Sequence, residues 1–322
     1  MARSGVRKQG LYLASSSAIF MGMMPVFGKQ AIQAGMLPLA VVAFRTFGAA
    51  SLLFAVVLLA RRRMLYIYPI GLAGCLLAGG LNGIGSLLYY TGLAHLDAGV
   101  AQLLFAFYPV FVALVLYIDG QRQGRLTLLR LLLSLPALFL LTHAAGADLD
   151  LKAAACVVAA SALYALHIPI NQRVLYEAPA PTVTLYTLLA MAAVVTPTWI
   201  VLAAPIHLPP AQASAPVLAL TAVTFFSRLC LFGSVKHIGG MQTSLLGLGE
   251  LIVALILSHI LLAERLSPEQ WAGACLLTAI LLLAGLDQGR PATQHGRGWL
   301  HWLRPPLPAE SLEPLHTPTS EP

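Results

Sequence analysis

Residues 17–25 read SAIFMGMMP, and residues 161–169 read SALYALHIP. The two stretches share serine and alanine at their start, an aromatic residue at the fourth position (Phe20 and Tyr164) and a closing proline, at an offset of 144. Each stretch lies inside a long apolar run, and each proline is followed four residues later by a basic residue. The pair therefore indicates an internal repeat.

Further matches extend the repeat at offsets of 140–141. They pair Gly92 with Gly233, Gly99 with Gly240, Ala113 with Ala254, and Arg125-Leu126-Thr127 with Arg265-Leu266-Ser267. Each half then holds five apolar runs, and an odd number of membrane crossings requires the second half to be inserted upside down. Inverted repeats of this kind are typical of alternating-access transporters, whose site lies near the midplane between the halves.

The composition places the chain in a membrane. Of its 322 residues, 58% are hydrophobic and 10% are charged, whereas soluble domains average about 45–50% apolar and about 25% charged. So few charges cannot cover a water-facing surface of this size. The composition therefore excludes a single soluble domain, a disordered chain and a secreted disulfide scaffold.

No pattern indicates a cofactor, a metal site or a catalytic centre. The four cysteines lie far apart in apolar stretches, without zinc or redox spacing. His-Glu-x-x-His, Gly-x-Ser-x-Gly and Walker A motifs are absent from the sequence. The net charge of +7 comes from basic residues scattered between apolar runs rather than clustered on one face. We expect neither an enzyme nor a nucleic-acid-binding protein.

Ten runs are long enough to cross a bilayer as helices, the form in which a segment satisfies its own backbone groups in lipid. They cover residues 11–28, 39–60, 69–94, 98–118, 126–145, 153–173, 182–204, 216–235, 241–262 and 269–286. The predicted fold is an all-α integral membrane protein of ten transmembrane helices, built as two inverted five-helix repeats at 11–145 and 153–286.

The basic residues predict the orientation. With both termini in the cytoplasm, the inner segments hold 14 Lys and Arg, the outer segments hold 3, and Arg45 and Arg228 lie within spans. This bias fits the positive-inside rule and a multi-pass protein of the cell (inner) membrane. Residues 1–10 are then a cytoplasmic N-terminus. The proline-rich residues 287–322 are a disordered cytoplasmic tail, whose segment 299–304 carries two tryptophans suited to the membrane interface.

Over about residues 11–286 the chain resembles the EamA family of the drug/metabolite transporter superfamily. The resemblance rests on the ten spans in two repeats and on Arg45, Tyr108-Pro109, Glu250 and the turn Glu264-Arg265-Leu266-Ser267. The sequence departs from the family at Ala263, where Gly is frequent, at Gly124, which stands where the second repeat has Glu264, and at Leu251, where Pro is common. The resemblance implies export or exchange of small metabolites, often amino acids, without ATP.

Three charged side chains, Arg45, Arg228 and Glu250, lie inside predicted spans, where each costs about 2.5–3.5 kcal/mol on insertion scales. Arg228 and Glu250 flank a hairpin that turns near Ile238, so both lie roughly 15–18 Å deep. This depth predicts an ion pair, which either lines a cavity and exchanges partners during transport or statically locks two helices. Arg45 either attracts an anionic group or snorkels to the interface.

Other polar residues recur at helical spacing. They indicate a cavity with aromatic walls and a few polar anchors, or, on the alternative interpretation, hydrogen bonds between helices. With the three charges, the predicted substrate-binding set is Arg45, Asn82, Tyr89, Gln102, Tyr108, Tyr164, His167, Asn171, Arg228 and Glu250.

The sequence favours a secondary transporter that exports or exchanges a small, amino-acid-like solute by alternating access. The alternative is a flippase for a lipid or a lipid-linked precursor. A large hydrophobic lateral opening would favour the flippase, whereas a closed polar cavity would favour the metabolite. The expected partners are a small-molecule solute and the lipid bilayer, and the oligomeric state is left open, with a homodimer as one option.

Overall fold

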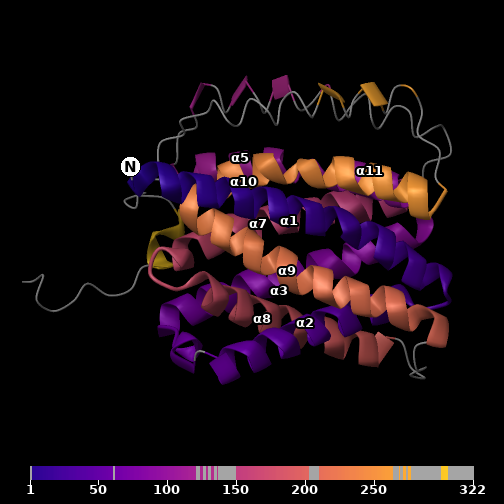
Figure 1. Cartoon of the computed structure of the whole chain (residues 1–322), viewed down its shortest axis with the longest axis horizontal. Helices are drawn as coiled ribbons and strands as arrows, with labels where there is room; N and C mark the ends of the chain where they lie inside the picture. The colour runs from indigo at the N-terminus through magenta and orange to yellow at the C-terminus, as the bar shows by residue number, and fades with distance from the viewer. Residues whose placement is uncertain are drawn as a thin grey trace, which may run out of the picture.

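The computed structural model describes residues 2–60, 62–120, 150–202, 210–263 and 299–303, together with isolated residues within 124–136 and 268–276. The described part is helical and contains no strand. Its long helices lie side by side in one bundle (Figure 1).

The helices are α1 (Ala2–Gln33), α2 (Pro38–Ala60), α3 (Pro69–His95), α4 (Ala98–Phe105), α5 (Tyr108–Ile118), α7 (Leu151–Leu175), α8 (Ala180–Leu202), α9 (Ser214–Ile238), α10 (Gly240–Gly247) and α11 (Gly249–Leu261). Three short 3-10 helices are η1 (Arg62–Leu65), η2 (Ala211–Ala213) and η4 (Trp299–Leu303). With α4–α5 and α10–α11 each taken as one span, eight spans in the described part are long and apolar enough to cross a membrane. The predicted spans 126–145 and 269–286 lie outside the residues described continuously.

Local sequence sets several of the helix boundaries. Proline begins α2 and α3, where its missing N–H is not needed for an intrahelical bond. Asp150 caps α7, because its carboxylate accepts the backbone N–H of Lys152 and Ala153 at 2.9 and 3.2 Å. Gly239 adopts a φ of 83° between α9 and α10, a conformation that glycine reaches without strain.

Two spans that the sequence predicted as continuous, 98–118 and 241–262, are each broken in the middle. The first is interrupted between α4 and α5 at Ala106 and Phe107, and the second between α10 and α11 at Leu248. Phe107 and Leu248 are 141 residues apart, the offset of the sequence repeat. Proline at 109 cannot donate to the carbonyl of residue 105, and glycines flank Leu248, so both sequences weaken the helix at this point.

The two halves pack as inverted copies. The first helix of each repeat contacts the third helix of the other most extensively, α1 with α9 and α3 with α7. The broken helices lie beside each other with α4 against α11 and α5 against α10, so they run antiparallel (Figure 1). The broken helices of the two repeats thus point in opposite directions, as an inverted repeat requires.

The ends of the chain differ from the sequence prediction. Helix α1 begins at Ala2, so most of the predicted N-terminal segment 1–10 continues the first span. Within the predicted disordered tail, η4 is folded against the bundle, with Leu300 and Leu303 buried. Their side chains pack with Ala78 of α3 and Ile170 of α7. Burial of the two leucine side chains removes apolar surface from water, and this burial stabilises the contact of η4 with the bundle.

Candidate functional site

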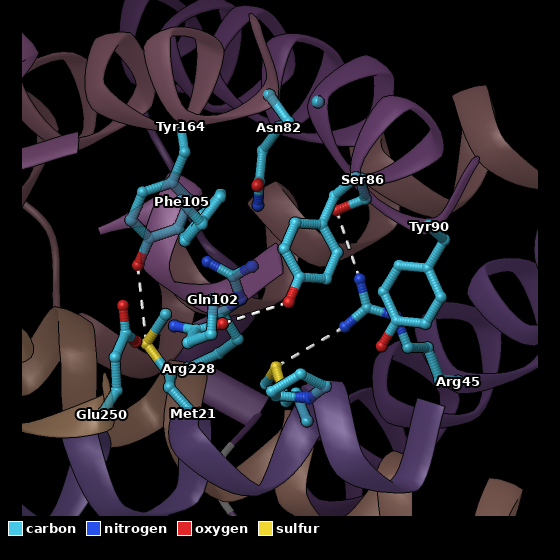
Figure 2. A pocket seen from close by; sticks show the side chains of 15 residues that line it. Met21, Arg45, Asn82, Ser86, Tyr90, Gln102, Phe105, Tyr164, Arg228 and Glu250 are labelled. Atoms are coloured by element: carbon cyan, nitrogen blue, oxygen red, sulfur yellow. Dashed lines mark hydrogen bonds between the residues drawn. The ribbon is translucent and has the colours of Figure 1, made fainter. Parts of the chain in front are cut away.

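A pocket lies between the two repeats. Helices α1, α2, α3 and α4 of the first repeat and α7, α9 and α11 of the second contribute its walls (Figure 2). Of its fifteen lining residues, fourteen are buried, and Phe105 is half-buried. The pocket is therefore built almost entirely from buried side chains.

Seven residues of the predicted binding set line this pocket. They are Arg45, Asn82, Tyr89, Gln102, Tyr164, Arg228 and Glu250. Because they come from six helices and from both repeats, neither half of the chain forms the site alone. This is the location between inverted halves that is typical of secondary transporters.

Arg45 projects into the pocket and does not snorkel to the interface. Its guanidinium donates to Ser86 Oγ at 3.2 Å and to Thr224 Oγ1 at 3.5 Å, and contacts Met24 Sδ at 3.7 Å. The guanidinium carbon also lies 4.7 Å from the centroid of the Tyr90 ring, as a cation–π contact. Nε has no hydrogen-bond partner. Arg45 is thus held from several sides by uncharged groups (Figure 2).

Arg228 and Glu250 both line the pocket, but the predicted ion pair between them is not formed. Among the described residues, the buried ion pair joins Arg173 and Asp119 instead. Arg228 lies 5.4 Å from the centroid of the Tyr164 ring, and its Nε and Nη1 have no hydrogen-bond partner. Both carboxylate oxygens of Glu250 are likewise without a partner. Similar depth in two helices does not bring two side chains together, because their directions around the helix axes also decide the distance between them.

Aromatic rings and an amide separate the charged groups. Tyr89 donates its hydroxyl proton to Gln102 Oε1 at 3.1 Å. The Phe105 ring packs against Tyr89 and Tyr164, with centroids 5.2 and 5.1 Å away. Tyr164 donates to Met21 Sδ at 3.5 Å. The cavity thus combines aromatic and thioether walls with a small number of polar anchors, the composition usual for small-molecule sites.

Three members of the predicted set lie outside the pocket lining. Tyr108 donates to the backbone carbonyl of Ser244 at 3.1 Å and so joins the two broken helices. His167 is buried, with Nδ1 against the carbonyl of Tyr164. Asn171 accepts the Thr187 hydroxyl at 3.1 Å between α7 and α8. Their contacts fit the alternative that the sequence left open, in which polar residues join helices.

Sequence reasoning missed several lining residues. Met21 and Met24 are uncharged, and Tyr90 lacks the helical spacing to Asn82 that Tyr89 has. The other lining residues outside the predicted binding set are Pro25, Gly85, Ser86, Phe105 and Ala160. Of these, Ser86 shares a helix face with Asn82 and Tyr89, and its helical spacing already indicated a position at the cavity. For Tyr90 the sequence gives no such signal, because its contact with Arg45 becomes visible only in the fold.

A second polar cluster lies at one end of the bundle, outside the pocket. The Arg173 guanidinium pairs with the Asp119 carboxylate, and both side chains are buried. The other oxygen of Asp119 accepts the backbone N–H of Leu300 in η4 at 3.1 Å. The cluster therefore connects the end of α5, the end of α7 and the C-terminal segment. Within the described residues, no group of three or more His, Cys, Asp and Glu could hold a metal ion.

Comparison with known proteins agrees with this architecture. No curated protein matches the chain, whereas 27 solved chains do. One of them, titled "Crystal structure of protein", has 16% sequence identity and a TM-score of 0.70, over 87% of this chain and 98% of its own. That likeness concerns the fold alone.

The family comparison is more informative. The model of the EamA-like transporter family matches twice, at residues 8–143 and 151–286, so the two matches coincide with the two repeats and cover most of the sequence. This chain belongs to the EamA-like transporter family, whose members are membrane transporters of the drug/metabolite superfamily.

Proposed function

We propose that this protein moves a small, amino-acid-like metabolite across the membrane by alternating access, as an exporter or exchanger. The observation that carries the proposal is the pocket between the repeats, which contains a buried cation, Arg228, and a buried anion, Glu250, each with polar atoms that lack a hydrogen-bond partner. Buried charged groups are normally paired. A solute with a carboxylate and an ammonium group would supply the missing partners.

The repeat arrangement supports alternating access. The pocket lies where inverted halves meet, and each half has a broken helix beside that of the other. Helix ends at such breaks absorb backbone changes when packed elements shift. Rocking of one half against the other would open the pocket to each side in turn.

The alternative, a lipid flippase, fits the pocket less well. Lipid chains need a wide apolar path, whereas this lining contains three charges, three tyrosines and two amides, and lacks Leu, Ile and Val among the described residues. Fourteen of the fifteen lining residues are buried. This favours a compact solute over a lipid.

The proposal is tested by flux into proteoliposomes. The wild-type protein is assayed with a panel of radiolabelled amino acids, with and without a proton gradient, and in parallel with a fluorescent phospholipid for scrambling. Arg228→Gln should reduce amino-acid flux by about 10- to 100-fold, the worth of one charge-assisted hydrogen bond. Arg63→Gln is the matched control, because Arg63 is exposed in η1, away from the pocket.

Three results would contradict the proposal. The first is a wild-type protein that moves none of the amino acids. The second is scrambling of lipid in preference to solutes. The third is normal amino-acid transport by a folded double variant, Arg228→Gln with Glu250→Gln, since the charges would then be structural.

A further inference from the structure

We infer that the transported solute is an α-amino acid whose side chain ends in an anionic group, so that it carries a net negative charge. The inference rests on the proposed transport function and names the substrate class of the same pocket. It follows from the number of charges in the pocket and from their distribution between two ends.

The pocket has an excess of positive charge. Its charged lining residues are Arg45, Arg228 and Glu250, so its net charge is +1, or +2 when Glu250 holds a proton. The predicted spans outside the described residues do not reverse this sign. Residues 126–145 contain no Asp or Glu, and 269–286 contain only Glu269, at the first position of the span. An uncompensated charge in a low-dielectric interior is costly, so occupation by an anion is favoured.

The end formed by α9 and α11 resembles a site for an α-amino acid head group. Arg228 and Glu250 have opposite charges and interact electrostatically. Nε and Nη1 of Arg228 and both carboxylate oxygens of Glu250 have no hydrogen-bond partner. The guanidinium suits a carboxylate, which it can bind through two N–H groups. The carboxylate of Glu250 suits an ammonium group. A zwitterionic head group therefore satisfies this end and leaves its net charge unchanged.

The other end holds a cation alone. Arg45 contacts Ser86, Thr224, Met24 and the Tyr90 ring, and every one of these groups is uncharged. Figure 2 shows Arg45 apart from Arg228 and Glu250. A head group bound at Arg228 and Glu250 would therefore direct its side chain toward Arg45. A terminal carboxylate or phosphate on that side chain would neutralise this second cation.

The geometry of Arg45 favours discrimination between anionic and neutral side chains of the solute. Its fixed hydrogen bonds and the stacked ring of Tyr90 restrict the guanidinium to one orientation, so little rotamer entropy remains to be lost on binding. A neutral amide of the same size would leave the buried charge uncompensated. Sites built to bind a polar group discriminate strongly against analogues that lack it.

The test compares glutamate with glutamine, which have nearly the same shape but differ in charge. Proteoliposomes containing the wild-type protein are assayed for counterflow of glutamate, aspartate, glutamine and O-phosphoserine. We expect glutamate flux to exceed glutamine flux by about 10- to 100-fold. Arg45→Gln should reduce this ratio by about tenfold or more, Arg45→Lys should restore part of it, and Arg63→Gln should leave it unchanged. Gel filtration of each variant checks that it is folded.

The outcomes separate the inference from the proposed function. Flux of glutamate or of O-phosphoserine above that of glutamine supports the inference, and the better of the two identifies the anionic group as carboxylate or phosphate. If neutral amino acids move faster than anionic ones, the inference fails while the transport function stands. If the ratio is the same in folded Arg45→Gln as in the wild type, Arg45 does not select the side chain and the inference also fails. If no amino acid moves, the transport function itself fails.

Discussion

The packing of α3 against α8 depends on one of two adjacent glycines. A Cβ added at Gly79 would lie 2.5 Å from both the Thr187 backbone oxygen and the Ala190 Cβ of α8. A Cβ added at Gly80 meets nothing within 4 Å among the described residues. The same chemical change at two successive positions therefore separates a packing effect from a general effect on helix stability.

The structure gives the expected magnitudes. Non-bonded carbon atoms prefer separations of about 3.5–4.0 Å, so Gly79→Ala must push α3 and α8 apart by about 1 Å, against backbone that cannot yield as a side chain can. Overpacking of this kind costs about 1–3 kcal/mol. Gly80→Ala makes no such contact and should stabilise the helix by as much as about 1 kcal/mol, because alanine loses less entropy there.

The free energy of unfolding is measured in mixed micelles titrated with a denaturing detergent, with tryptophan fluorescence as the readout. We expect Gly79→Ala to unfold at a lower detergent fraction than the wild type, and Gly80→Ala at an equal or higher one. Equal stability of the two variants would refute the reasoning, because α3 and α8 would then not be in contact at this glycine.

Two further changes test the polar cluster and the C-terminal segment. Asp119→Asn leaves buried Arg173 without its counterion and should cost about 3–5 kcal/mol in the same unfolding assay, most of which the double variant Asp119→Leu with Arg173→Met recovers. A cost below about 1 kcal/mol for the single variant would show that the pair is solvated. Leu303→Ala removes a side chain that is 1% exposed and should release η4, seen as faster limited proteolysis of the C-terminal segment. Trp302→Ala, at a position that is 43% exposed, should change the proteolysis rate far less, and equal rates for both variants would argue against docking of η4.

Much of the fold could be predicted because the membrane imposes strong constraints. Apolar runs of about 20 residues must be helices, and the described structure confirms eight such spans. The shared serine, alanine and proline of 17–25 and 161–169 correctly indicated two repeats, which the family match confirms. Periodic apolar sequence predicts that a helix exists, but it does not predict interruptions within it. The breaks near Phe107 and Leu248 therefore became visible only in the structure.

The site was less predictable, because side-chain partners depend on distances between helices. The sequence showed that Arg228 and Glu250 lie at similar depth, yet depth alone does not place two side chains within contact distance. For Tyr108, His167 and Asn171, polar character alone did not distinguish residues that line a cavity from residues that join helices. The buried pair of Asp119 and Arg173 was missed for a related reason, since Asp119 directly follows the predicted span 98–118 and Arg173 ends the predicted span 153–173, where charged residues are expected at the membrane surface.

The repeat explains why the fold is symmetric while the site is not. At the offset of 141 that relates the broken helices, Glu250 corresponds to Pro109 and Arg228 to Leu87. Both repeats thus retain the break, but only the second retains charges beside it. Glu250 lies in the first turn of α11, where the free N–H groups and the helix dipole partly offset the cost of a buried carboxylate. The break therefore supplies a position at which one repeat can hold a charge in the bilayer.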